Sequence, residues 1–363
     1  MVLKFLVKIV FLYSPILLRI ALMNRPILDV KHLTTRLKIG QQSVAVVDNL
    51  SFELYAGKTL ALVGESGSGK TMTALSLMRI LPHPPALPSS GEVIYRERNL
   101  LTLSEKEMRQ LRGGKIAMIF QDPSSALNPV YTIGNQLVEA AELHLGLYGE
   151  AAIHCSIQAL AEVGIPSPRE RFEDYPHQLS GGMRQRVMIA MALIGEPDVL
   201  IADEPTTALD VTVQAQIIDL ILGLQKRKQM AVLLITHDMG IVAEIADDLI
   251  VMYAAQGIEK GSTVQIFDQM AHPYTQGLFA ARPSLRRSDE KLHPIKGSVP
   301  SLYHFPEGCR FHPRCPYVME RCRRGDVPYF SVDGPSHLAK CWLRDENEES
   351  REKRSLFQRF GEC

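Results

Sequence analysis

The stretch that decides the fold runs from residue 58 to residue 81 and reads KTLALV-GESGSGKT-MTALSLMRIL. Its first part, Lys58 to Val63, is a short apolar run typical of a buried strand. Its last part has Leu75, Met78 and Leu81 on one face of a helix, at helical spacing. The sequence therefore predicts a strand, a glycine-rich turn and a helix in direct succession.

The turn between that strand and that helix fits the pattern of a phosphate-binding loop. Glycines let the backbone wrap so that N–H groups point at phosphate oxygens, at the positive end of the following helix. The Lys70 ammonium would reach the β- and γ-phosphates, and the Thr71 hydroxyl would ligate Mg²⁺. An ordinary Gly-rich turn is the alternative, and the strand–loop–helix context disfavours it. The predicted nucleotide-binding residues of the loop are Gly64, Glu65, Ser66, Gly67, Ser68, Gly69, Lys70 and Thr71.

A second apolar run, VLIADE at 199–204, ends in two carboxylates. A buried strand can hold Asp203 in the coordination shell of Mg²⁺, and Glu204 then lies where it could polarise an attacking water. The alternative is a strand that ends in a solvated acidic turn. Its position downstream of the glycine-rich loop favours the phosphate site.

A third segment, LSGGMRQR at 179–186, can form a second anion site. Ser180 can cap a helix, and the two glycines that follow expose backbone amides. A plain helix N-cap is the alternative, and physical reasoning alone leaves it open.

This segment resembles the signature sequence of ABC ATPases, which few other proteins carry beside a phosphate-binding loop. In that family the signature of one subunit closes over the ATP held by the loop of another. The resemblance implies that four residues contact the ATP of a partner subunit: Ser180, Gly181, Gly182 and Gln185.

Further positions resemble elements of the same family. Gln121, in IFQDP, resembles the glutamine that touches Mg²⁺ and senses the membrane subunit, and Asp210, in ALD, resembles the D-loop. His237, in THD, resembles the switch histidine that contacts the γ-phosphate. A single His or Gln usually has a structural role, but at these positions we expect function. The resemblance implies catalytic roles for Glu204, His237 and Gln121, and Mg²⁺ ligation by Thr71, Gln121 and Asp203.

One position departs from the family pattern. Where the family places an aromatic residue that stacks on adenine, this chain has Leu37. A leucine gives apolar contact without a π face, so stacking should weaken by about 1 kcal/mol. We expect Leu37 to contribute to nucleotide binding, with a reduced preference for the base.

Strands and helices alternate along the chain, for example at 115–120, 211–224, 231–236 and 248–253, which indicates an α/β fold with a mostly parallel central sheet. Together with the resemblance, this predicts a P-loop NTPase domain of the ABC type over residues 24–281. Its helical signature subdomain should occupy about 131–195. A small Cys-containing module should follow at 282–343, and a loose, charged tail at 344–363.

Residues 1–23 are apolar and basic, with no acidic residue. Lys8 and Arg19 interrupt the apolar run, which disfavours a signal peptide and a membrane span. We expect Met23 to be the native start, and a helix on the membrane surface is the main alternative.

Composition limits the possible classes of function. The chain has 363 residues, 46% of them hydrophobic and 22% charged, which excludes a disordered chain and a polytopic membrane protein. Forty basic residues balance forty acidic ones. Because no global field attracts nucleic acid, we expect no nucleic-acid partner.

The C-terminal part carries four cysteines within 33 residues: Cys309, Cys315, Cys322 and Cys341. They follow HPYTQGL at 272–278, which resembles the opening of the C-terminal extension in peptide-importer ABC ATPases. In that branch such cysteines are associated with an iron–sulfur cluster, and four thiolates can hold a [4Fe–4S] cluster. Structural zinc more often shows a tight C-x2–4-C pair, which is absent here. Free thiols and a disulfide pair remain open.

The resemblance covers about Ile27 to Trp342. It implies an ATP- and Mg²⁺-dependent ATPase subunit that drives import of di- or oligopeptides, bound peripherally at the cytoplasmic face of the inner membrane. The implied partners are two membrane permeases, a second ATPase that is a paralogue, and an extracytoplasmic peptide-binding protein. The alternatives are the same engine acting on nickel or another small solute, a soluble ABC ATPase, and a regulator that senses redox state.

Overall fold

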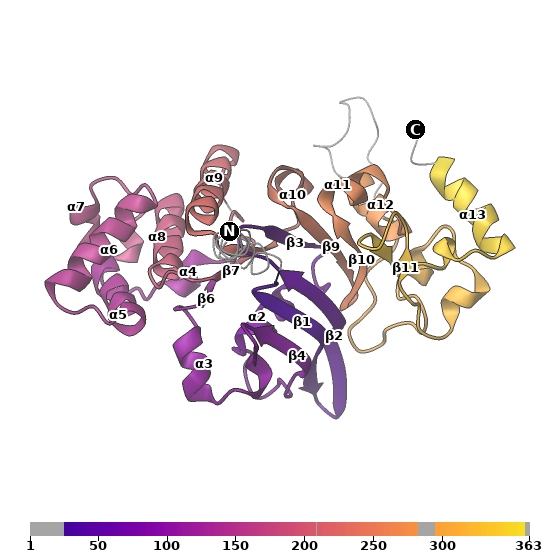
Figure 1. Ribbon diagram of the computed structural model, residues 1–363, viewed down its shortest axis with the longest axis horizontal. Helices are drawn as coiled ribbons and strands as arrows, with labels where there is room; N and C mark the ends of the chain where they lie inside the picture. Colours follow the sequence, from indigo (N-terminus) through magenta and orange to yellow (C-terminus); the bar gives the residue numbers. More distant parts are fainter. Residues whose placement is uncertain (1–24, 208, 282–294, 360–363) are drawn as a thin grey trace, which may run out of the picture.

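The computed structural model describes residues 25–207, 209–281 and 295–359. The expected N-terminal extension at 1–23 lies outside these residues, as does the start of the expected C-terminal module at 282–294. The molecule is elongated, with a group of helices at one end and the C-terminal module at the other (Figure 1). Two sheets lie between them.

The larger sheet has eight strands in the order β11-β12-β10-β9-β3-β8-β7-β6. Its parallel part is made of β3 (Thr59–Val63), β6 (Ile116–Ile119), β7 (Val199–Asp203), β8 (Ala231–Ile235) and β9 (Asp248–Tyr253). Every residue of β3, β7 and β8 is buried, which is why these strands read as continuous apolar runs. The predicted parallel centre of the sheet is confirmed.

The smaller sheet is antiparallel, in the order β2-β1-β4-β5. Its strands are β1 (Leu28–Ile39), β2 (Gln42–Leu54), β4 (Ser90–Tyr95) and β5 (Arg98–Asn99). Helix α2 (Lys70–Met78) shares one hydrophobic core with β1 and β3, through residues such as Val30, Leu62 and Leu77. The first turn of α2, which carries the end of the predicted loop, is therefore fixed between two sheets. Two short elements, η1 (Leu100–Thr102) and α3 (Glu105–Leu111), follow β5.

Helices between β6 and β7 form the end of the molecule at the left of Figure 1. They are α4 (Pro123–Ala126), α5 (Ile133–Leu145), α6 (Glu150–Glu162), α7 (Pro168–Phe172), η2 (Pro176–Gln178) and α8 (Gly181–Leu193). These helices share one hydrophobic core with Leu200 and Ala202 of β7. Leu137, Leu160 and Ile189 in this core are fully buried. This group is the helical subdomain that the signature segment belongs to.

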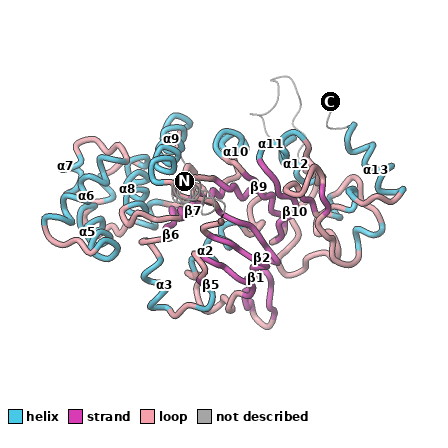
Figure 2. Tube along the Cα trace, viewed as in Figure 1, coloured by secondary structure: helices cyan, strands magenta, loops and turns pink. Residues whose placement is uncertain are grey.

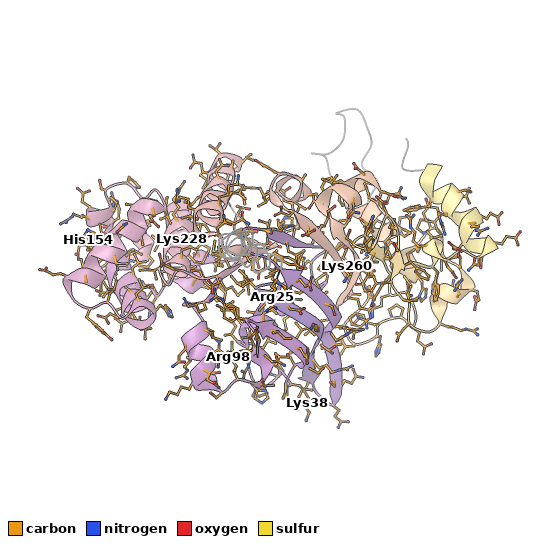
Figure 3. All side chains as sticks on the ribbon, in the orientation of Figure 1. Arg25, Lys38, Arg98, His154, Lys228 and Lys260 are labelled. Atoms are coloured by element: carbon orange, nitrogen blue, oxygen red, sulfur yellow. The ribbon has the colours of Figure 1, made fainter. Side chains whose placement is uncertain are left out.

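The rest of the ATPase part packs on the other strands. Its elements are α9 (Val211–Lys228), α10 (Met239–Ile245), β10 (Gln256–Ser262), α11 (Thr263–Asp268) and α12 (Pro273–Ala280). Basic side chains are spread over the molecule: Figure 3 labels Lys38 on β1, Arg98 on β5, His154 on α6 and Lys228 on α9.

The C-terminal module, which we define as residues 295–359, has little regular structure (Figure 2). It contains η4 (His312–Arg314), η5 (Glu320–Arg323), β11 (Phe330–Ser331), β12 (Leu338–Ala339), η6 (Trp342–Arg344) and α13 (Glu348–Arg359). Strand β12 pairs with β10 and so joins the module to the large sheet.

The expectation of a loose tail is wrong for the described part of the tail. Residues 348–359 form α13, and Phe357 is only 3% exposed, with its ring edge-on to Tyr317 at 5.4 Å. Charged residues dominate the composition of this helix, but buried Phe357 and Ser350, and hydrogen bonds from Lys353 and Arg354 to carbonyls of the module, dock it.

Candidate functional site

The glycine-rich turn between β3 and α2 is tightly enclosed. Gly64 has φ +155°, and a Cβ there would lie 2.2 Å from the Met252 carbonyl oxygen. Gly69 has φ +105°, and a Cβ there would lie 2.5 Å from the Val46 carbonyl oxygen. Both positions need glycine, because a side chain would collide with backbone and the conformation suits only glycine.

The side chain of Lys70 is held at this loop. It is 6% exposed, and its ammonium donates to the carbonyl oxygens of Gly64 at 2.8 Å and of Glu65 at 3.1 Å. A buried ammonium surrounded by backbone donors and acceptors can exchange carbonyl partners for phosphate oxygens.

The end of β7 brings a carboxylate to the first turn of α2. The Thr71 hydroxyl donates to Asp203 Oδ1 at 3.2 Å, and Asp203 is 2% exposed. Burial raises the pKa of Asp203 to about 6, although the hydrogen bond from Thr71 lowers it. A hydroxyl and a carboxylate at one point are the hard oxygen donors that Mg²⁺ prefers, so these two residues fit the predicted ion.

Glu204 is the centre of a cluster of predicted catalytic residues. Its carboxylate accepts from Gln121 Nε2 at 3.0 Å, and His237 Nδ1 lies 3.2 Å from its other oxygen. Thr207 Oγ1 also donates to it, at 2.8 Å. Burial raises the pKa of Glu204, but the hydrogen bonds from Thr207 and His237 outweigh it and leave the pKa below its ordinary value. The carboxylate is therefore ionised at neutral pH, as a general base must be.

The backbone at Glu204 is in the left-handed region, with φ +47°. Such a conformation is uncommon for a residue with a side chain and is concentrated at functional sites. Its N–H donates to the Ile235 carbonyl of β8 at 2.8 Å, which holds the turn in place. The strand end thus presents Glu204 between Gln121, which follows β6, and His237, which follows β8.

The signature segment begins α8. Ser180 caps the helix by accepting from the Met183 N–H at 3.3 Å, and a Cβ on Gly181 would meet nothing within 4 Å. The start of α8 is therefore open to an approaching group. Gly182 faces Val213 of α9, whose Cγ1 would be 3.1 Å from a Cβ.

The side chain of Gln185 makes a contact within this chain, and its predicted contact with a partner's ATP stays a prediction. It is 2% exposed, and its amide donates to the Pro205 carbonyl at 2.6 Å. In this structure the side chain links α8 to the turn after Glu204 and does not face outward. Asp210 caps α9 by accepting from the Val213 N–H at 2.9 Å.

Leu37 lies half-buried on β1, opposite Val44 of β2, and forms an isolated bridge with Ala86. No described contact joins it to the phosphate loop. Its contribution to adenine binding stays a prediction.

The four cysteines of the module lie together as free thiols. The Cys309 N–H donates to the Cys322 carbonyl at 2.9 Å, and Cys341 interacts electrostatically with Cys309 and Cys315. Burial raises the pKa of Cys309 to about 11 and that of Cys315 to about 12. Within residues 25–207, 209–281 and 295–359, however, no group of three or more His, Cys, Asp or Glu side chains is arranged to hold a metal ion.

Three contacts at the site come from residues that the sequence did not single out for it. Thr207 supports Glu204, and Tyr274 and Arg314 contact Glu65 of the loop. Arg314 lies beside a cysteine, but no spacing in the sequence indicates that it reaches a residue 249 positions away.

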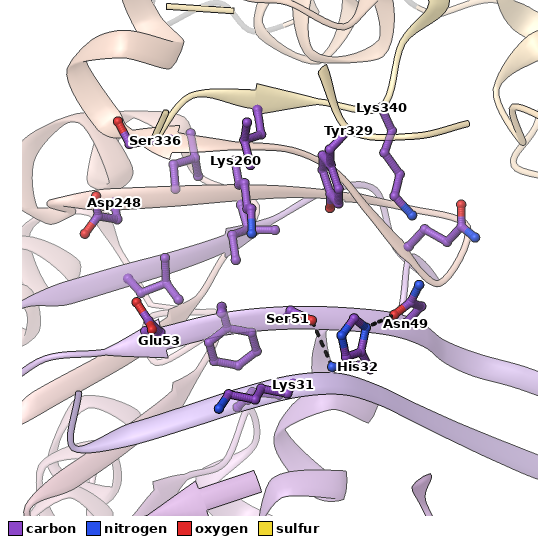
Figure 4. A pocket seen from close by; sticks show the side chains of 18 of the residues that line it. Lys31, His32, Asn49, Ser51, Glu53, Asp248, Lys260, Tyr329, Ser336 and Lys340 are labelled. Atoms are coloured by element: carbon purple, nitrogen blue, oxygen red, sulfur yellow. Dashed lines mark hydrogen bonds between the residues drawn. The ribbon is translucent and has the colours of Figure 1, made fainter. Parts of the chain in front are cut away.

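A pocket of about 1060 Å³ lies elsewhere, between the small sheet, β9, β10 and the module. Its lining includes both acidic and basic side chains, with the ammonium groups of Lys260 and Lys340 at 5.3 and 5.1 Å from the ring centroid of Tyr329 (Figure 4). None of the predicted ATP-site residues lines it. The pocket is therefore separate from the loop and the Glu204 cluster.

The fold and this site together define a P-loop ATPase domain with a helical subdomain. Solved structures agree. The dimeric ATP-binding cassette MJ0796, in a post-hydrolysis state with ADP and Pi, matches with a TM-score of 0.57 and 26% identity, over 65% of this chain and 98% of that chain. CbiO1 from Clostridium perfringens, part of an ABC transporter complex, matches with a TM-score of 0.57 and 27% identity, over 67% and 91% of the two chains.

Sequence comparisons give the family. Residues 47–207 match the family of ABC transporters, and residues 258–322 match the C-terminal region of oligopeptide/dipeptide transporters. The dipeptide transport ATP-binding protein DppD of Bacillus subtilis is 48% identical over 323 residues, which cover 89% of this chain and 96% of that protein. A DppD of Haemophilus influenzae is 47% identical, over 87% and 94% of the two chains. The chain belongs to the ATP-binding proteins of ABC transporters and is an ATPase.

Within the described residues, no helix has the length and apolar character needed to cross a bilayer.

Proposed function

We propose that this chain hydrolyses ATP to drive the import of di- or oligopeptides across the cytoplasmic membrane. The observation that carries the proposal is the match of residues 258–322 to the C-terminal region of oligopeptide/dipeptide transporters. The contacts of Glu204 with Gln121 and His237 support it. The relatives reported above are named for dipeptide transport, so the alternatives of nickel or another small solute have no support from them.

Glu204 acts as the general base. Its ionised carboxylate polarises the water that attacks the γ-phosphate, and Gln121 and His237 hold the carboxylate from two sides. Lys70 and the amides of the loop take up charge that develops on the phosphate oxygens. Thr71 and Asp203 would hold Mg²⁺, with Gln121 as a further ligand, and the ion would supply positive charge to the phosphates.

Two ATPase subunits close head to tail around two ATP molecules. The exposed start of α8, at Ser180, Gly181 and Gly182, supports this proposal, because a helix N-terminus with free amides stabilises a negative charge. Asp210 lies at the start of the neighbouring helix α9, whose Val213 faces Gly182. We propose a paralogue as the second subunit.

The chain works at the cytoplasmic face of the membrane, bound to two permeases, and an extracytoplasmic binding protein delivers the peptide. Affinity purification of the full chain from native membranes, followed by mass spectrometry, should recover two permeases and a second ATPase. Recovery of the chain without membrane proteins contradicts the proposal. So does a deletion strain that keeps peptide uptake and loses uptake of nickel.

We further propose that Cys309, Cys315, Cys322 and Cys341 hold a [4Fe–4S] cluster. Four free thiols in one module, two of them buried, match the donor set of such a cluster, although their described arrangement has to change to ligate it. Anaerobic purification should give a brown protein with a broad absorption band near ~400 nm and about four irons per chain. Stoichiometric zinc without iron, or free thiols alone, contradicts this.

A further inference from the structure

Three aromatic rings lie beneath the phosphate loop. Tyr253 at the end of β9, Tyr274 of α12 and Phe311 of the module pack with centroid distances of 4.6, 5.3 and 5.4 Å. All three side chains are at most 2% exposed. The rings come from the large sheet, from helix α12 and from the module. They therefore form a rigid junction between the ATPase part and the module.

Arg314 lies on this junction and reaches the loop. Its guanidinium pairs with both carboxylate oxygens of Glu65, at 2.7 and 3.1 Å, and it is centred 5.8 Å from the Tyr253 ring and 5.9 Å from the Phe311 ring. The Arg314 side chain is 5% exposed. It also donates to the carbonyls of Ile295 and Lys296, at 3.3 and 3.0 Å. The guanidinium is buried, makes two hydrogen bonds to the Glu65 carboxylate and is fixed by further carbonyl acceptors. The ion pair is therefore held in a single geometry.

The backbone of the same loop residue is fixed as well. The Glu65 N–H donates to the Tyr274 hydroxyl at 2.8 Å, and the Glu65 carbonyl accepts from the Lys70 ammonium. Side chain, N–H and carbonyl of Glu65 are thus all bonded, with glycine on one side of it and Ser66-Gly67 on the other. Residues flanked by glycine lose much conformational freedom when they become ordered, so prior anchoring lowers the entropic cost of ordering the loop around phosphates.

From these contacts we infer that Arg314 and Tyr274 are positioning residues of the phosphate loop, and that the C-terminal module is a working part of the ATP site. Arg314 also neutralises a carboxylate within a loop that must receive a polyphosphate. Without the arginine, the partly exposed Glu65 carboxylate would repel ATP. This inference rests on the proposed role of residues 64–71 in nucleotide binding.

The module offers a matched control in Arg310. This arginine forms another ion pair with the ATPase part, to Asp48 of β2, and its side chain is 14% exposed. It also donates to the Ala254 carbonyl and has no described contact with the loop. Arg310→Gln therefore removes a comparable attachment of the module and leaves Glu65 untouched.

The test compares Arg314→Gln, Glu65→Gln, the double variant and Arg310→Gln. Each is measured as the full chain assembled with its permeases, for KM and kcat of ATP hydrolysis, and as the purified full chain, for Kd of a fluorescent ATP analogue. Arg314→Gln should raise KM and Kd about tenfold, which corresponds to ~1.4 kcal/mol, with kcat changed less than about twofold. Glu65→Gln should raise KM and Kd less than Arg314→Gln does. The double variant should have KM and Kd equal to or lower than those of Arg314→Gln, because it no longer contains an unpaired carboxylate.

Equal increases in KM for Arg310→Gln and Arg314→Gln would overturn the inference, since any loosening of the module would then suffice. Unchanged KM in both Glu65→Gln and Arg314→Gln would overturn it too. If Arg314→Gln fails to fold, Glu65→Gln alone decides, because its amide keeps the shape and loses the charge. Failure of the proposed function looks different: the unmodified chain would then bind no ATP analogue, or Lys70→Ala would bind it normally.

Discussion

In the ATP site, the reacting groups come from the carboxyl ends of neighbouring parallel strands. The attachment of the C-terminal module depends much more on individual side chains that contact residues far away in the sequence. Asp203 is the last residue of β7 and Glu204 follows it, and His237 follows β8, which pairs with β7. Besides the short pairing of β12 with β10, the module is held by Arg310, Arg314 and His337, each bonded to one carboxylate of the ATPase part.

This difference has a physical meaning. Where topology brings groups together, a conservative substitution leaves the geometry intact and removes only the chemistry. Where one buried pair makes the attachment, a substitution leaves a buried partner unsatisfied and weakens the structure. We therefore expect damage to activity in the first region and damage to stability in the second.

The largest effect is expected from Glu204→Gln. The amide keeps the size of the side chain but cannot accept a proton, so turnover should fall by roughly 10²- to 10⁴-fold while ATP binding persists. Steady-state ATPase assays with the assembled transporter, together with equilibrium ATP binding, measure both. Glu196→Gln, which removes an exposed carboxylate paired with Lys228, is the control. Undiminished turnover in Glu204→Gln would remove this residue from the role of base.

A smaller effect on stability is expected from Glu259→Gln, in the attachment of the module. The Glu259 carboxylate is fully buried and accepts from the N–H groups of Ala271 and His272, from Thr275 and from His337, at 2.6 to 2.9 Å. In Glu259→Gln, the NH₂ group of the new side chain would face N–H and O–H donors and could not pair with them. The free energy of unfolding should therefore fall by about 1–3 kcal/mol.

Denaturant unfolding and limited proteolysis of the module measure the effect of Glu259→Gln, and ATP binding reports on the loop. Glu320→Gln, at a side chain that is 74% exposed in its ion pair with Arg324, should change neither. If Glu259→Gln is as stable as the unmodified chain, single buried pairs do not hold the module.

Gln185→Leu separates the two roles considered for that glutamine. Because the buried amide donates to the Pro205 carbonyl, the leucine should leave that carbonyl unpaired and lower the stability of the isolated chain by about 1–2 kcal/mol. Thermal unfolding of the isolated chain measures this without any partner subunit. A contact with a partner's ATP predicts the opposite pattern, with normal stability of the isolated chain and weaker ATP-driven dimerisation.

The smallest effect is expected at the edge of the ATP site. Leu37→Tyr would restore a π face on β1 and should tighten ATP binding by about 0.5–1.5 kcal/mol, with little change for inorganic triphosphate, which has no base to stack. Competition binding with ATP and triphosphate measures the difference. Equal shifts for the two ligands would show that position 37 does not touch adenine.

Much of the ATPase part could be predicted because its physics is local. The run from Lys58 to Val63 reads as a buried strand since both of its faces are covered, and the parallel register then brings Thr71 to Asp203. The sequence did not reveal that the Gln185 amide donates to the Pro205 carbonyl, because that contact depends on how α8 packs against the turn after Glu204. The contact between Arg314 and Glu65 depends on how two distant segments pack, and no periodicity or spacing carries that information.

The short pairing of β12 with β10 has a consequence for the behaviour of shortened chains. β10 would otherwise be the edge of the large sheet, and its row of backbone N–H and C=O groups would be free to recruit a strand from another molecule. Two residues, Leu338 and Ala339, occupy part of that row, with β11 outside them. A chain truncated after residue 281 would keep the phosphate loop and Glu204 but expose this edge, and it should aggregate faster with increasing concentration than the full chain.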